Sequence, residues 1–329
     1  MSSNTTTTTS TQPQPMFPPG YIPDYPRLSA WDSPSAAFVF MAATIVITGL
    51  TIRNLFFSAK TQHSKSVYVY LLFWCTFRIV AFAMRGHDLL GTNGQDYEVY
   101  KYTQIVLSIG FMPLAEVLCF NVAEASTLIY ELSHKTYIRL RILVSVLFVV
   151  FGTCVTAYVM DFTLNKPFGS NAKDYETDLV LREVGFNGLF LITIYTLFAA
   201  IRNSLAIVSK HHIPPSYMTR MRTMMRIVAF QSILMIIKLI YITYRNWNPK
   251  EFRDEVWWYV LSITPEYVFM LFFLKHDWFM SVYDEVEMVV GEDGNRDEEK
   301  GEAGKKEEVT TVEVETIVLS QVAGPSGEQ

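Results

Sequence analysis

Long apolar runs alternate with short polar segments along the chain, and seven of these runs approach the length of a membrane-spanning helix. A helix crosses a hydrocarbon core of about 30 Å with about 20 apolar residues. Runs such as AAFVFMAATIVITGLTI and ILVSVLFVVFGTCVTAYVM contain no charged residue. The pattern predicts an all-α integral membrane protein, a seven-transmembrane-helix bundle with helices at residues 36–57, 66–85, 104–131, 141–161, 184–208, 223–245 and 255–275.

The segments outside the seven runs have a different composition. Residues 1–34 are rich in Thr and Pro and predict a disordered tail, whereas 35–276 form the bundle. In 277–290, apolar residues recur at helical spacing (Phe279, Val282, Val286 and Val289), which predicts an amphipathic helix on the membrane surface. Residues 291–329 are rich in Gly, Glu and Lys and predict a disordered acidic tail.

The distribution of Lys and Arg indicates the orientation of the bundle, because cytoplasmic loops carry an excess of these residues. With the N-terminus outside and the C-terminus cytosolic, the inner loops hold more basic residues than the longer outer loops. The overall formal charge of -5 comes mainly from the acidic tail, so it does not indicate nucleic-acid binding. We expect a multi-pass protein of the plasma membrane.

Ionisable residues inside the apolar runs are the candidate functional residues. A charged side chain at bilayer depth is costly, so it faces the bundle interior and has a partner. Matching depths and a short connecting loop favour a pair between Lys238 and Glu266, with Arg78 and Glu116 as the second pair. With Asn121 they form the candidate ligand site or polar path: Arg78, Glu116, Asn121, Lys238 and Glu266.

Glu124 lies nearer the inner side of the third run, where Arg53, Arg139 or Arg226 could reach it as a packing or gating latch. Pro113 and Pro265 precede Glu116 and Glu266, and a proline bends a helix because it removes a backbone N–H. The same charges fit two interpretations: a ligand pocket or transport path, and a structural ion-pair network that fixes helix register.

Few other chemical motifs occur. Asn4 begins an N-glycosylation acceptor sequence. The basic inner loop at 209–226 and the C-terminal tail are candidate docking sites for a cytosolic partner, and membrane lipids contact the bundle. Three cysteines within apolar runs and six scattered histidines suggest no metal site, and we expect no cofactor.

The layout of seven helices, a basic third inner loop and an amphipathic segment after helix seven resembles that of G-protein-coupled receptors. The third helix ends in LIYELSHK and the seventh contains TPEYVF, in place of the usual receptor motifs. Mid-helix seven holds Glu266 and no lysine, so retinal is not expected. The resemblance implies sensing of an external small-molecule or lipid ligand.

The Pro/Tyr-rich lead, the Arg-ended second helix FRIVAFAMR and the Pro-containing third helix resemble the fungal RTA1-like family. That resemblance implies lipid translocation or export. No nucleophile–base or metal constellation suggests an enzyme. The hypotheses are therefore a receptor-like protein, a transporter or lipid translocator, and a structural membrane protein.

Overall fold

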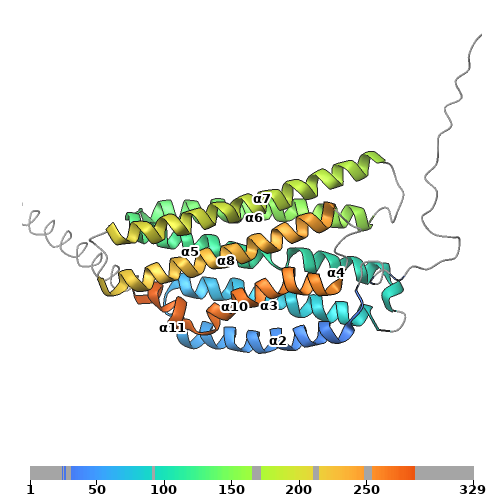
Figure 1. Cartoon of the computed structure of the whole chain (residues 1–329), viewed down its shortest axis with the longest axis horizontal. Coiled ribbons are helices and arrows are strands. Elements are labelled where there is room, and N and C mark those ends of the chain that lie inside the picture. The colour runs from blue at the N-terminus through green and yellow to red at the C-terminus, as the bar shows by residue number, and fades with distance from the viewer. Residues whose placement is uncertain are drawn as a thin grey trace, which may run out of the picture.

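A computed structural model describes Asp24, Pro26 and residues 31–90, 93–164, 172–209, 215–247 and 254–285, and over these residues the protein is a bundle of helices without strands (Figure 1). Seven helical stretches among them are long and apolar enough to cross a membrane, which confirms the predicted fold class. The elements are α2 (Pro34–Arg53), η1 (Asn54–Ser58), α3 (Gln62–Asp88), η2 (Asn93–Gln95), α4 (Tyr97–Ile109), α5 (Met112–Tyr130), α6 (His134–Leu164), α7 (Ala172–Ala206), η3 (Ile207–Ser209), α8 (Pro215–Trp247), α9 (Glu255–Trp258), η4 (Tyr259–Ile263), α10 (Thr264–Leu274) and α11 (His276–Phe279).

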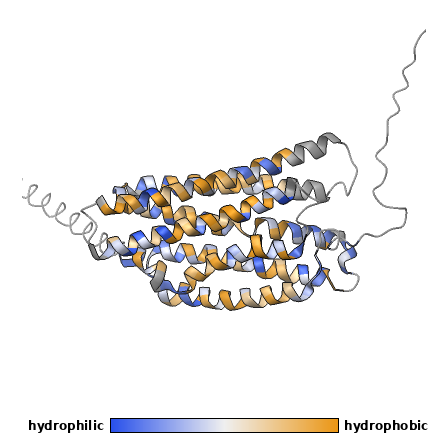
Figure 2. Ribbon diagram, viewed as in Figure 1, coloured by the Kyte–Doolittle hydropathy of each residue, from blue (hydrophilic) through white to orange (hydrophobic). Residues whose placement is uncertain are grey.

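Large apolar side chains cover the outside of the bundle, as a lipid environment requires. Val149, Leu191 and Phe198 are 65–67% exposed although each lies within a spanning stretch. Hydrophobic residues dominate the helices along the middle of the bundle, and hydrophilic ones become more frequent toward its two ends (Figure 2). This distribution is the reverse of a water-soluble surface and fits a multi-pass membrane protein.

The third span, Glu98–Tyr130, is the most buried of the seven, with 67% of its most apolar stretch inside the protein. It consists of two helices, α4 and α5, which meet at Gly110 and Phe111. Pro113 lies in the first turn of α5, where its missing N–H leaves no helical hydrogen bond unmade. The sequence predicted one helix over 104–131, whereas the structure divides it just before this proline.

The third span lies among the other helices. α5 packs against α3, α6, α7 and α8, while α2 packs against α3 at the periphery. The last span consists of α9, the π-helical turn η4 and α10, and α10 packs against α8 and α2. Glycines allow the closest approach of α7 to α6: a Cβ on Gly185 would lie 2.6 Å from the Val155 side chain.

The bundle has two ends, which we name after residues that organise them. The Asp284 end is where α2 ends and α3 begins, and the Arg85 end is where α2 begins and α3 ends. At the Asp284 end the chain continues from α10 into α11 and a helical turn over 281–285.

The residues after α10 fold into the protein. Phe279 and Val282 are at most 2% exposed and belong to the hydrophobic core. The helical spacing over 277–290 predicted that they face lipid on a surface helix, whereas the structure buries them against protein. Core-facing residues recur at the same spacing as lipid-facing ones, so the spacing alone does not distinguish the two. Val286 and Val289 lie outside the described residues.

Candidate functional site

One carboxylate in the last span binds two cations from two other spans. Glu266 Oε1 lies 2.6 Å from Arg78 Nη2 of α3 and 2.7 Å from Lys238 Nζ of α8. Arg78 Nε donates a second hydrogen bond to Glu266 Oε2 at 2.6 Å, so the guanidinium is bidentate. The three side chains are at most 2% exposed. We call these residues the Glu266 cluster.

Neighbouring polar groups satisfy the rest of the cluster. Trp74 Nε1 donates to Glu266 Oε2 at 2.6 Å, and Lys238 Nζ donates to the hydroxyl and the carbonyl oxygen of Ser262 at 2.6 and 3.1 Å. The Lys238 ammonium also lies 5.1 Å from the centre of the Phe111 ring. Each charge is therefore compensated by fixed partners, as a buried ion in a low-dielectric interior requires.

The local backbone explains why Glu266 lies at this point. The π-helical turn η4 ends at Ile263, and Pro265 lies in the first turn of α10. Glu266 follows in the same turn. π-Helical turns inside longer helices occur frequently at functional sites.

The structure separates the remaining predicted residues from the Glu266 cluster. The expected pair between Arg78 and Glu116 is not formed, because Arg78 binds Glu266 and Glu116 accepts a hydrogen bond from Ser145 of α6 at 2.6 Å. Asn121 is buried, and its side-chain oxygen lies 3.2 Å from His63 Nε2. The predicted candidates thus divide into separate groups.

Glu124 lies beside a histidine. Its carboxylate is 3.5 Å from His63 Nδ1, whereas the arginines considered as its partners form no salt bridge with it over the described residues. Arg139 is exposed on α6. Asn4 lies outside the described residues.

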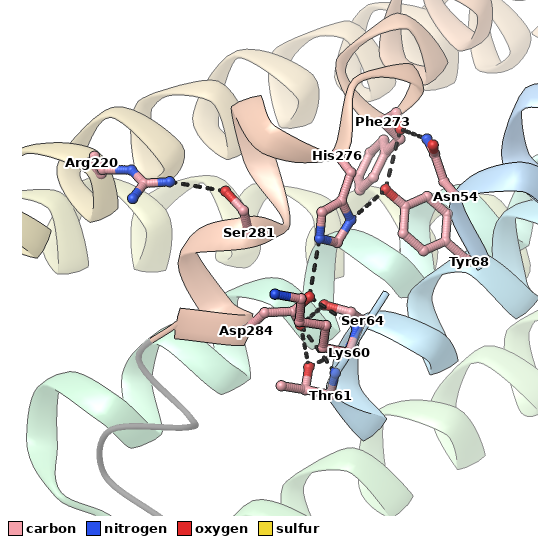
Figure 3. A network of polar contacts seen from close by, with 10 residues as sticks. All are labelled: Asn54, Lys60, Thr61, Ser64, Tyr68, Arg220, Phe273, His276, Ser281 and Asp284. Atoms are coloured by element: carbon pink, nitrogen blue, oxygen red, sulfur yellow. Dashed lines mark hydrogen bonds and ion pairs between the residues drawn. The ribbon is translucent and has the colours of Figure 1, made fainter. Parts of the chain in front are cut away.

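A second polar network, which the sequence analysis did not identify, lies at the Asp284 end (Figure 3). The Asp284 carboxylate accepts hydrogen bonds from the backbone N–H of Lys60 and of Thr61 at 3.1 and 3.2 Å. It also accepts from the hydroxyls of Thr61 and Ser64, each at 2.5 Å. Since Thr61 is the N-cap of α3, Asp284 binds the start of that helix.

The Asp284 network continues through His276 to the end of α10. His276 Nε2 lies 3.0 Å from Asp284, and His276 Nδ1 lies 3.1 Å from the Tyr68 hydroxyl. Burial raises the pKa of Asp284, but the hydrogen bonds from His276, Ser64 and Thr61 outweigh burial and hold that pKa below its ordinary value. Asp284 is therefore an ionised clamp between the C-terminal segment and α3.

A third buried carboxylate organises the Arg85 end. Glu255 Oε1 lies 2.6 Å from Arg85 Nη2, and Glu255 Oε2 accepts from the backbone N–H of Asp32 and Ser33 at the start of α2. The Arg85 guanidinium carbon lies 4.4 Å from the Trp31 ring centre and 4.1 Å from that of Trp258. Arg85 ends the sequence FRIVAFAMR and lies in the last turn of α3.

Among the described residues, no group of three His, Cys, Asp or Glu side chains is placed to hold a metal ion. In each of the three networks, a buried carboxylate connects separate helices through ion pairs or hydrogen bonds. In comparisons with protein-family models, curated proteins and solved structures, nothing matched this chain, so its function has to be argued from these contacts.

Proposed function

We propose that this chain is a receptor-like seven-helix membrane protein, whose resting arrangement is held by the Glu266 cluster. The observation that carries the proposal is that one carboxylate on α10 binds cations from both α3 and α8. A buried ion pair is either made or broken, because a separated charge inside the protein is costly. A ligand that competes for one of these three charges would therefore shift the helices between discrete arrangements.

α8 has a second polar tether, at its opposite end. Arg220 near the start of α8 donates to Ser281 Oγ at 2.9 Å and lies 2.6 Å from Glu285. Arg220 and Lys238 are about 27 Å apart along the helix at 1.5 Å per residue. A movement of α8 at the Glu266 cluster is thereby transmitted to the Asp284 end as a rigid-body shift.

The tether at Arg220 is suited to break during such a shift. The side chains of Arg220 and Glu285 are 42% and 36% exposed, and an ion pair this exposed contributes at most about 1 kcal/mol. The proposal places the N-terminus outside and the Asp284 end in the cytosol of a plasma-membrane protein. Of the basic segment 209–226, which was expected to be a loop, the structure places 215–226 in the first turns of α8, and this part would offer a cytosolic partner a surface beside the weak contact.

The proposal is tested by measuring the position of α8 directly. Spin labels at the exposed positions Thr223 on α8 and Lys135 on α6 report their separation in lipid nanodiscs, in a background without the native cysteines. Glu266→Gln should add a second population displaced by about 2 Å or more, the scale of helix shifts in switching proteins. Glu116→Gln is the matched control, because its carboxylate contacts Ser145 and not α8.

Two results would oppose the proposal. An unchanged distance distribution in folded Glu266→Gln protein would reduce the cluster to a structural element. If Glu266→Gln fails to fold, Lys238→Met provides the same measurement, since it leaves the Arg78–Glu266 pair in place. Movement of a labelled phospholipid across the bilayer by the reconstituted full chain, without any shift of α8, would favour the translocator instead.

A further inference from the structure

A groove of about 580 Å³ lies between α3, α5 and α6, toward the Asp284 end. Its polar lining includes His63, Glu124 and Arg141, and its apolar wall follows α6 from Ile142 to Val150. Arg78, Lys238 and Glu266 do not line it. The groove is therefore separate from the Glu266 cluster.

The apolar wall of the groove is also part of the lipid-facing surface. Ile142, Val146 and Val149 are 58%, 52% and 67% exposed, and they lie on a helix that is long and apolar enough to span the membrane. A molecule that enters the groove past these side chains therefore comes from the bilayer. This excludes most water-soluble ligands and leaves membrane lipids as the available occupants.

Arg141 supplies a positive charge that no carboxylate of the described residues neutralises through a salt bridge. Its Nη2 donates to the Ser66 hydroxyl, its Nη1 donates to the Tyr137 hydroxyl at 3.5 Å, and its guanidinium carbon lies 4.5 Å from the centre of the Phe120 ring. These contacts orient the planar guanidinium and leave further N–H groups for an anion. A fixed guanidinium of this kind binds phosphate oxygens through two parallel hydrogen bonds.

The depth of Arg141 matches the level of a phospholipid phosphate. α6 spans His134–Leu164, 31 residues or about 46 Å, whereas the hydrocarbon core is about 30 Å thick. Each end of a centred helix thus extends about 8 Å beyond the hydrocarbon. Arg141 lies about 10 Å from the start of α6, about 2 Å inside the hydrocarbon boundary, and its long side chain can extend to the phosphate level, with the apolar wall continuing about 12 Å further into the hydrocarbon.

Glu124 determines which headgroup fits beside Arg141. Its carboxylate lines the same groove and lies 3.5 Å from His63 Nδ1. A headgroup with only negative charge would be repelled by this carboxylate, whereas the ammonium of a zwitterionic headgroup is attracted by it. The pair of opposite charges is complementary to a headgroup that itself carries both.

We propose that this groove binds one zwitterionic glycerophospholipid, with its phosphate on Arg141, its ammonium toward Glu124 and an acyl chain along the valines of α6. The site holds a lipid from the adjacent leaflet as a bound component of the protein. The proposal does not depend on the receptor-like function, because none of the three charges of the Glu266 cluster takes part in it.

The test uses the full chain purified into mild detergent and incubated with defined lipids: phosphatidylethanolamine, phosphatidylcholine or phosphatidylglycerol. Native mass spectrometry then counts the lipids retained per protein. We expect one zwitterionic lipid to be retained in preference to phosphatidylglycerol. Arg141→Gln should weaken retention about tenfold, the loss expected for a charge-assisted hydrogen bond, whereas Arg139→Gln, an exposed change on the same helix, should not.

Two further variants separate lipid binding from misfolding. Val146→Trp fills the groove from its exposed side without altering a charge, and it should expel the lipid while the thermal unfolding midpoint stays unchanged. Glu124→Gln should raise the retention of phosphatidylglycerol relative to phosphatidylcholine. Equal retention of all three lipids by the native protein, or equal retention by Arg141→Gln and Arg139→Gln, would overturn the proposal.

Discussion

Glu266→Gln should lower the free energy of unfolding more than Lys238→Met does. Glu266→Gln leaves the guanidinium of Arg78 and the ammonium of Lys238 buried at 1% and 2% exposure without their carboxylate. Breaking a buried pair by removing one partner costs about 3–5 kcal/mol. Since this change leaves two cations, we expect a loss at the upper end of that range.

Lys238→Met should cost less, about 1–3 kcal/mol, because it removes one charge-assisted contact to Glu266 together with the hydrogen bonds to Ser262. Glu266 then keeps both contacts to Arg78 and the hydrogen bond from Trp74. If Lys238 and Glu266 formed a simple pair, replacing both with apolar residues would be nearly neutral. In the observed cluster that double change leaves Arg78 unpaired, and only a triple change that includes Arg78→Met should recover stability.

The assay is thermal unfolding of the single, double and triple variants in nanodiscs, followed by intrinsic tryptophan fluorescence. A loss of 3–5 kcal/mol corresponds to a midpoint shift of roughly 6–20 °C. Glu116→Gln is the control for loss of a partly buried carboxylate, since its contact is the hydroxyl of Ser145. A nearly neutral double variant, or equal losses for Lys238→Met and Glu266→Gln, would refute the shared-carboxylate argument.

Three further predictions follow from the ends of the bundle and its helix contacts. Asp284→Asn should lower stability by about 2 kcal/mol at pH 7. Because the folded state lowers the pKa of Asp284, this difference should stay constant above about pH 5 and decrease as the pH falls below its ordinary pKa of about 4; a constant difference down to pH 3 in urea unfolding would contradict it. Glu255→Ala should accelerate amide hydrogen exchange at Asp32 and Ser33, just before α2, because it removes the carboxylate that accepts from both N–H groups and leaves Arg85 buried without it; unchanged exchange would refute the capping role. Gly185→Ala should cost about 1–3 kcal/mol, because its Cβ would lie 2.9 Å from a backbone oxygen of α6. Gly49→Ala, with open space around its Cβ, should be neutral or slightly stabilising, and equal thermal midpoints for the two variants would contradict the close approach.

The seven spans were predictable because apolar length alone identifies a membrane helix. The helical spacing of apolar residues does not show whether lipid or protein covers them. For this reason the surface helix expected at 277–290 differs from the structure, which buries Phe279 and Val282. Phe279 and Val282 are three residues apart, a spacing that serves a lipid-facing helix and a core-facing helix equally well. Burial in the core distinguishes the two, and burial depends on neighbours that are distant in the sequence.

Depth along a helix was also predictable, whereas the direction of a side chain around the helix was not. Lys238 and Glu266 lie on consecutive spans at similar depth, and the structure brings them together. Arg78 and Glu116 also have suitable depths, but Glu116 points to α6 and Arg78 points to α10. Matching depth is therefore a necessary condition for a pair, and the packing angle of each helix decides between the possible partners.

The three buried carboxylates of residues 254–285 have a common role that local sequence does not reveal. Glu255 binds the start of α2, Glu266 binds the interior of α3, and Asp284 binds the start of α3. The backbone N–H groups of Asp32 and Ser33 before α2, and of Lys60 and Thr61 at the start of α3, donate to carboxylates of residues 254–285. Because an unsatisfied N–H is costly where water is scarce, this C-terminal segment stabilises the first two spans at three depths. A change that moves α10 should therefore alter the contacts of Glu255 and Asp284 at the two ends of the bundle.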